Sequence, residues 1–146
     1  MLTEKDYCDY ETCVALKKLG YNEKTLAYYT SEGFFHWIRA YIYDVAIPDL
    51  ANSSNKKPYK HIIDAMSLYE AQKWMREVKG IIVRVIPIYE ERKLIKGISY
   101  THEVIYWTDG YVTDECIEEY PSYEEALSEG IKEAVKILKN GLDSKR

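Results

Sequence analysis

Histidine, cysteine and phenylalanine are scarce in this chain of 146 residues, which contains three, three and two of them, respectively. The histidines, His36, His61 and His102, form no HxxxH or HExxH pair, so no helix is expected to carry two metal ligands on one face. The sequence also lacks GxSxG, P-loop and GxGxxG motifs. We therefore expect no catalytic residue, no metal and no cofactor, although a site assembled only in space stays open.

Disulfides and membrane spans are not expected either. Cys8, Cys13 and Cys116 are odd in number and have no CxxC spacing, which indicates free thiols. No apolar run approaches the roughly 18 residues that cross a bilayer. The opening MLTEKDYCDYE is acidic where a secretory signal would be basic and then apolar. Together these features predict a cytoplasmic protein.

The chain lacks an excess of positive charge, because its formal net charge is −4 and its pI is near 5.5. That balance opposes a general affinity for nucleic acid, which needs a basic surface. Residues 109–129 contain eight acidic side chains and no lysine or arginine. A small basic group, Lys56, Lys57, Lys60 and His61, has the opposite sign.

Tyrosine, in contrast, is abundant, with fifteen in the chain. Its ring is apolar and its hydroxyl needs a polar partner or water, so tyrosine suits surfaces that are half exposed. We expect these residues on the exposed face and margins of a sheet, or on a binding face.

Three segments place apolar residues at helical spacing: 9–20, 67–80 and 122–141. Each begins with a side chain that can cap the first amides and ends at a glycine that can adopt the left-handed conformation. The Tyr-Glu pairs near the three starts are therefore interpreted as helix beginnings, where a glutamate complements the helix dipole. Gly130 lies on the apolar stripe of the last segment, which predicts a close approach of that helix to a strand.

Between the helices the pattern changes to alternation, which predicts strands at 25–29, 34–43, 81–89 and 97–107. The first two are expected to form a hairpin through residues 30–33, and the last two through residues 90–93. Pro87 cannot donate a ladder hydrogen bond, so we expect it near a strand end or at a sheet edge. Thr108, Asp109 and Gly110 are expected to turn the chain away.

The fold class predicted from this order is α+β, with a helix-hairpin-helix-hairpin-helix order. We expect one mainly antiparallel four-stranded sheet with the helices largely on one face. A single domain over 1–146 is expected, with a mobile loop within 45–65 and a frayed tail at 142–146.

The blocks YCDYETCVALKKLGY, SLYEAQKWMREVKGIIVRVIP and SYEEALSEGIKEAVKIL resemble a family of small uncharacterised proteins associated with phages and integrated mobile elements of gut bacteria. The resemblance covers the three predicted helices and the strand after the second. It carries over no functional residues. It implies a cytoplasmic accessory protein that acts by touching a partner rather than by transforming a substrate.

These observations favour a small noncatalytic protein-interaction module. Its candidate contacts are the acidic pair Glu118 and Glu119, which suits a basic protein surface, and the aromatic group Trp37, Tyr41 and Tyr43. No membrane partner is expected.

Three alternatives stay open. Trp37, Tyr41 and Tyr43 could stack single-stranded nucleic acid while Lys56, Lys57 and Lys60 touch its phosphates. An enzyme site could assemble around His61 and Asp64. The aromatic face could also pair with its twin in a homodimer.

Overall fold

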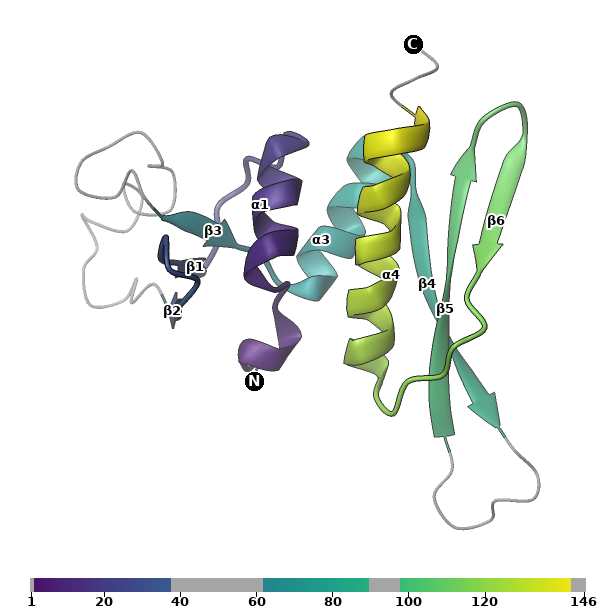
Figure 1. Cartoon of the computed structure of the whole chain (residues 1–146), viewed down its shortest axis with the longest axis horizontal. Coiled ribbons are helices and arrows are strands. Elements are labelled where there is room, and N and C mark those ends of the chain that lie inside the picture. The colour runs from purple at the N-terminus through teal and green to yellow at the C-terminus, as the bar shows by residue number, and fades with distance from the viewer. Residues whose placement is uncertain (1, 38–61, 90–97, 143–146) are drawn as a thin grey trace. The chain divides into compact units, whose positions relative to one another are not determined.

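The computed structural model describes residues 2–37, 62–89 and 98–142 (Figure 1). Within it the chain forms two compact units, residues 1–67 and residues 68–146. Most of the segment 45–65, for which a mobile loop is predicted, lies outside the described residues, as does 143–146 in the tail. The prediction of a single domain over 1–146 stays a prediction.

In its described residues, the first unit has helix α1 beside a small antiparallel sheet with the strand order β2-β1-β3. Helix α1 packs against β3. The elements, in chain order, are a 3-10 turn η1 (Glu4–Asp6), α1 (Tyr10–Lys18), β1 (Ala27–Tyr29), β2 (Phe35–Trp37) and β3 (Ile63–Ala65).

Helix α1 begins and ends as predicted. The side chain of Asp9 accepts a hydrogen bond of 2.9 Å from the amide of Thr12, which satisfies one of the free donors of the first turn. At the other end Gly20 has φ +108°, and the amide of Tyr21 donates to the carbonyl of Leu16 at 3.0 Å. This turn folds the buried Tyr21 back on the last turn of the helix.

The part of the second unit that the structure describes has a three-stranded antiparallel sheet, in the order β4-β5-β6, and two α-helices. Helix α4 packs against β4 and β5, and α3 packs against α4 (Figure 1). The elements are α3 (Leu68–Trp74) with a π-helical turn η3 (Met75–Lys79), β4 (Ile82–Tyr89), β5 (Ile98–Trp107), β6 (Tyr111–Glu115), and α4 (Tyr123–Ile137) with a π-helical turn η4 (Leu138–Leu142).

The ends of these helices confirm most of the predicted boundaries. Gly80 ends the second helix with φ +70°, and the Ser122 hydroxyl accepts a hydrogen bond of 3.1 Å from the amide of Glu125 at the start of α4. Gly141 does not end α4, because the helical turn continues through Leu142. The apolar spacing of the segment 67–80 predicts a buried Val78, but this side chain lies in the π-helical turn and is 58% exposed, whereas Met75 of the same turn is fully buried.

Gly130 lies where α4 crosses the sheet, which confirms the predicted close approach. A Cβ atom added there would be 2.6 Å from Cγ1 of Val83 and 3.2 Å from Cβ and Cγ of His102. Both neighbours are buried strand residues, so a larger side chain has no room. The absent side chain of Gly130 therefore brings α4 close to β4 and β5.

The prediction of a helix-hairpin-helix-hairpin-helix order with one four-stranded sheet is wrong, because the described residues form two separate three-stranded antiparallel sheets, although the class is α+β as predicted. The two predicted strand pairs are antiparallel neighbours, β1 with β2 and β4 with β5, while residues 38–43 and the connection predicted at 90–93 lie outside the described residues. Pro87 lies on β4, an edge strand of the described sheet, as predicted. Two short strands were missed. Strand β3 ends a polar segment, and β6 (YVTDE) is acidic, so neither has a clear apolar alternation. The turn at Thr108–Gly110 leads back into the sheet as β6 instead of leaving it.

Candidate functional site

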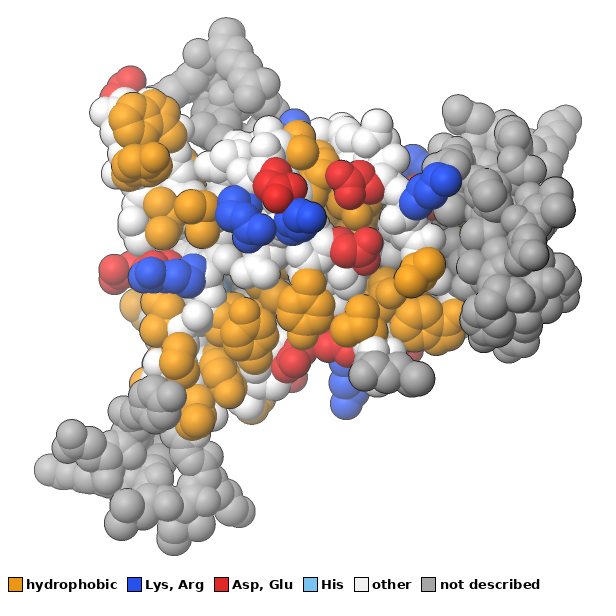
Figure 2. Space-filling model, turned by 180° about the vertical axis from the view of Figure 1, so that it is seen from behind, with side chains coloured by type: hydrophobic (Ala, Val, Ile, Leu, Met, Phe, Trp, Pro, Cys, Tyr) orange, Lys and Arg blue, Asp and Glu red, His pale blue; other side chains and the backbone are white. Residues whose placement is uncertain are grey.

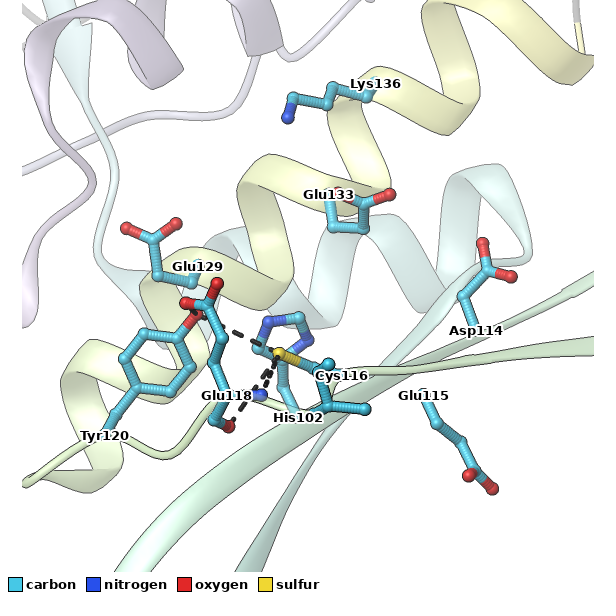
Figure 3. Close-up of a pocket in the computed structure, with 10 residues that line it drawn as sticks. His102, Asp114, Glu115, Cys116, Glu118, Tyr120, Glu129, Glu133 and Lys136 are labelled. Atoms are coloured by element: carbon cyan, nitrogen blue, oxygen red, sulfur yellow. Dashed lines mark hydrogen bonds between the residues drawn. The ribbon is translucent and has the colours of Figure 1, made fainter.

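A pocket of about 380 Å³ opens in the second unit where β5, β6, the following segment 116–120 and α4 meet (Figure 3). Most of its lining side chains are charged. They are His102, Asp114, Glu115, Cys116, Ile117, Glu118, Tyr120, Glu129, Glu133 and Lys136.

Local structure explains how the lining residues come together. Glu129, Glu133 and Lys136 follow the i, i+4, i+7 spacing of one helix face, so all three line the same side of α4. The segment after β6 is held to β5 by its backbone, because the Tyr100 amide donates to the Tyr120 carbonyl at 2.9 Å and the Tyr120 amide donates back at 2.7 Å. This pairing places Tyr120 against the sheet.

His102 is the buried polar residue of the pocket, with 6% of its surface exposed. Its ring stacks on Tyr120, with centroids 5.9 Å apart and an interplanar angle of 25°. Within the described part of the chain, its Nδ1 atom has no hydrogen-bond partner. Such an atom costs about 1–3 kcal/mol when it is left unsatisfied.

The charge state of His102 follows from its burial. Burial lowers the pKa of this imidazole below its ordinary value, and the nearby carboxylates of Glu133, Glu129 and Glu118 oppose that shift. Burial is the larger effect, so His102 is neutral at neutral pH. A neutral imidazole has one nitrogen that accepts a hydrogen bond and one that donates.

Cys116 and Tyr120 form a polar cluster with Glu118 (Figure 3). The Glu118 amide donates to Sγ of Cys116 at 3.4 Å, and the Tyr120 hydroxyl lies 3.9 Å from the same sulfur. The hydroxyl also donates to Oε2 of Glu118 at 3.3 Å. Burial, Cys116 and Glu118 raise the pKa of Tyr120, so its phenol stays protonated and keeps its role as a donor.

The pocket is strongly negative. Five carboxylates line it, Asp114, Glu115, Glu118, Glu129 and Glu133, against the one lysine Lys136. Lys132, outside the lining, pairs with Glu129 at 3.3 Å. The described residues hold no group of three or more ligands that would bind a metal ion. The charge of the lining therefore favours a cation over an anion.

The two residues of the predicted acidic pair, Glu118 and Glu119, have different surroundings in the structure. Glu118 lines the pocket, whereas the carboxylate of Glu119 accepts a hydrogen bond from the Ser99 hydroxyl of β5. Ile117, directly before them, is 96% exposed. No prediction was made for this isoleucine, although its place within the acidic stretch 114–119 is a signal that could have found it.

Trp37 belongs to the first unit, at the end of β2. Its ring makes edge contacts with Tyr7 at 5.2 Å and Phe35 at 5.0 Å, and 45% of its surface is exposed. The other residues predicted for a binding face, Tyr41, Tyr43, Lys56, Lys57, Lys60 and His61, lie outside the described residues.

Asp64, proposed as a partner of His61, has another partner in the structure. Its carboxylate lies 3.8 Å from Nζ of Lys17, so it links β3 to α1. Burial raises the pKa of Asp64, and Lys17 opposes that shift. Among the described residues this aspartate joins a strand to a helix.

Sequence reasoning missed the pocket itself. His102 and Glu103 are neighbours in β5 whose side chains point to opposite faces, since Glu103 pairs with Arg84 of β4 while His102 lines the pocket beneath α4. The i, i+4 spacing of Glu129 and Glu133 was a usable signal. Their juxtaposition with Cys116 and Tyr120 depends on β6, which was not predicted.

The chain matches no protein-family model, no curated protein and no solved structure. The family resemblance stated from the sequence therefore stays a prediction. In the part of the chain that the structure describes, the helices are too short or too polar to cross a bilayer.

Proposed function

We propose that the protein is a noncatalytic interaction module that binds a basic protein through residues 115–119 of its second unit, here called the acidic surface. The observation that supports this proposal is the exposure of Ile117, 96%, between acidic side chains. Glu115, Glu118 and Glu119 around it are also exposed.

The chemistry of the acidic surface defines the partner. An apolar side chain surrounded by charges matches the usual arrangement of an interface, in which an apolar centre is enclosed by a polar rim. Carboxylates on that rim attract lysine and arginine, which raises the association rate and selects against acidic partners. The partner is therefore a protein with a small apolar depression bordered by basic side chains.

A second exposed group lies at the start of β6, at the opposite end of the strand from the acidic surface. Tyr111 is 77% exposed and packs edge-to-face on the exposed Trp107, with ring centroids 4.8 Å apart. Figure 2 shows hydrophobic side chains at the tip of this hairpin. Aromatic side chains are enriched at protein interfaces, so this pair is a second contact for the same partner.

Substitution of Ile117 tests the proposal. Ile117→Ser is expected to reduce the amount of a basic protein captured from a nuclease-treated lysate, because it removes the apolar centre of the contact. Leu26→Ser, which changes an exposed leucine of the first unit, is the matched control and is expected to leave capture unchanged. Equal capture by the Ile117→Ser variant and the wild type would reject the acidic surface as the contact.

The cellular context is also a proposal. We place the protein in the cytoplasm, which is supported by three free cysteines, Cys8, Cys13 and Cys116. Its role as an accessory protein of a phage or mobile element is supported only by the resemblance of its three helical blocks.

A further inference from the structure

The pocket beside the acidic surface has features that a protein-protein contact does not explain. It is a hollow rather than a projecting apolar side chain, and it reaches inward to a buried histidine. Its carboxylates on α4, Glu129 and Glu133, lie outside the segment 115–119. A separate ligand accounts for this arrangement.

We propose that the pocket lined by Glu118, Glu133 and His102 binds a small organic cation, namely an alkyl group that ends in an ammonium or guanidinium. This site goes beyond the proposed function, since it recognises a single cationic group whether or not a partner protein is bound.

Charge is the first argument for a cation. Five carboxylates and one lysine line the pocket, so a positive ligand is attracted and a phosphate or carboxylate is repelled. In Figure 3 the side chain of Glu118 lies between those of Tyr120 and Cys116, while Glu129 and Glu133 project from α4. The lining carboxylates thus come from β6, from the segment that follows it and from α4.

The buried histidine is the second and independent argument. His102 is more than nine-tenths buried, it lines the pocket, and within the described part of the chain its Nδ1 has no partner. A buried nitrogen without a hydrogen-bond partner is uncommon in folded proteins, which indicates that a bound group supplies the partner. An ammonium or guanidinium supplies several N–H donors, which suit both a neutral imidazole nitrogen and the carboxylates.

The size and the wall of the pocket limit the ligand further. A volume of about 380 Å³ is near the lower end of the range for small-molecule sites, so the ligand has few heavy atoms. The ring of Tyr120 gives the pocket an apolar portion for a short alkyl chain. A free amine or guanidine and the side chain of a lysine or arginine both have this chemistry.

Nuclear magnetic resonance titration of the full chain tests the proposal. The probes are n-butylguanidine and n-butylamine, with n-butanol as the neutral probe of similar size. We expect both cations, and not n-butanol, to shift the amide resonances of residues 114–120 and 129–136. No shift with either cation, or equal shifts with n-butanol, would overturn the proposal.

Three variants locate the site. Glu133→Gln and Glu118→Gln are each expected to weaken binding of n-butylguanidine by about fivefold, since each removes one charge from a partly exposed group. Glu125→Gln is the control, because Glu125 is an exposed acid of the same helix that does not line the pocket. Equal weakening by all three variants would show attraction by net charge alone and would contradict a specific site.

A further titration with a peptide distinguishes a free small molecule from an arginine side chain of a partner protein as the source of the cation. The probe is acetyl-Gly-Arg-Gly-amide, compared with n-butylguanidine. Binding of the peptide at least as tight as that of the free guanidine assigns the pocket to an arginine of a partner protein. Weaker binding of the peptide assigns it to a free small molecule. Because these titrations use no partner protein, their failure is distinct from a failure of the proposed protein contact.

Discussion

Gly130 sets the distance between α4 and the sheet, because both neighbours of its Cα are buried side chains of β4 and β5. A glycine on an otherwise apolar helical stripe costs about 1 kcal/mol relative to alanine, so its presence indicates a packing requirement. The caps Asp9 and Ser122 and the turn at Gly20 depend on a few neighbouring residues only, which is why they can be predicted from the sequence.

Replacement of Gly130 by alanine is expected to destabilise the protein, although alanine is the better helix former. The added methyl group would be 2.6 Å from Cγ1 of Val83, a stiff β-branched side chain. Overpacking of this kind costs about 1–3 kcal/mol, so thermal denaturation should show a lower Tm, and a still lower one for Gly130→Leu.

A second substitution separates this contact from other effects. Val83→Ala removes the clashing atom, so the double variant with Gly130→Ala should be more stable than the sum of the two single changes predicts. An unchanged or higher Tm for Gly130→Ala alone would refute the close approach of α4 to β4.

The burial of His102 predicts a dependence of stability on pH. Because the pKa of His102 in the folded chain lies below its ordinary value of 6.5, the unfolded chain binds a proton first as the pH falls. Stability from this residue is thus complete above about pH 6.5 and decreases as the pH falls toward the folded pKa. Urea unfolding from about pH 7.5 to about pH 5 should show this decrease.

Comparison with variants isolates the contribution of His102. The decrease should be smaller in His102→Gln, while His36→Gln, which changes an exposed histidine, should follow the wild type. The same decrease in all three proteins would mean that the carboxylates, and not His102, determine the pH dependence.

At the scale of elements, sequence patterns predicted the long strands and helices and missed the short strands. Strand β4 has a run of β-branched residues and β5 is long and rich in β-branched and aromatic residues, whereas β3 has three residues and β6 has two acids among five. Such strands are stabilised by pairing with a neighbour rather than by their own residues. The pocket depends on β6 and on the backbone pairing of Tyr120, so it was not predictable from local patterns.

The π-helical turn after α3 gives a prediction about two nearby side chains. Val78→Ser should change the free energy of unfolding by less than about 0.5 kcal/mol, because Val78 is largely exposed. Met75→Ala, at a fully buried position of the same turn, should cost about 2–5 kcal/mol. Chemical denaturation measures both. A large cost for Val78→Ser would mean that this turn is a regular helix with Val78 facing the core.

At the scale of the whole molecule, the two compact units differ in the functions they suggest. The first unit provides an aromatic cluster around Tyr7, Phe35 and Trp37. The second provides the acidic surface and the pocket, so its binding chemistry is directed toward positive charge. This distribution was visible in the sequence only as an acidic stretch without basic residues.

The central claim is that the acidic surface binds a basic protein, and capture by a variant with reversed charge tests it most directly. The double variant Glu118→Lys with Glu119→Lys is compared with Glu23→Lys with Glu32→Lys, which makes the same change of net charge at exposed acids of the first unit. Each is used to capture proteins from a nuclease-treated lysate at low salt, with quantification and identification by mass spectrometry. The account predicts a stoichiometric partner with a basic surface that the wild type and the control retain and the Glu118/Glu119 variant loses. Undiminished capture by that variant would contradict it.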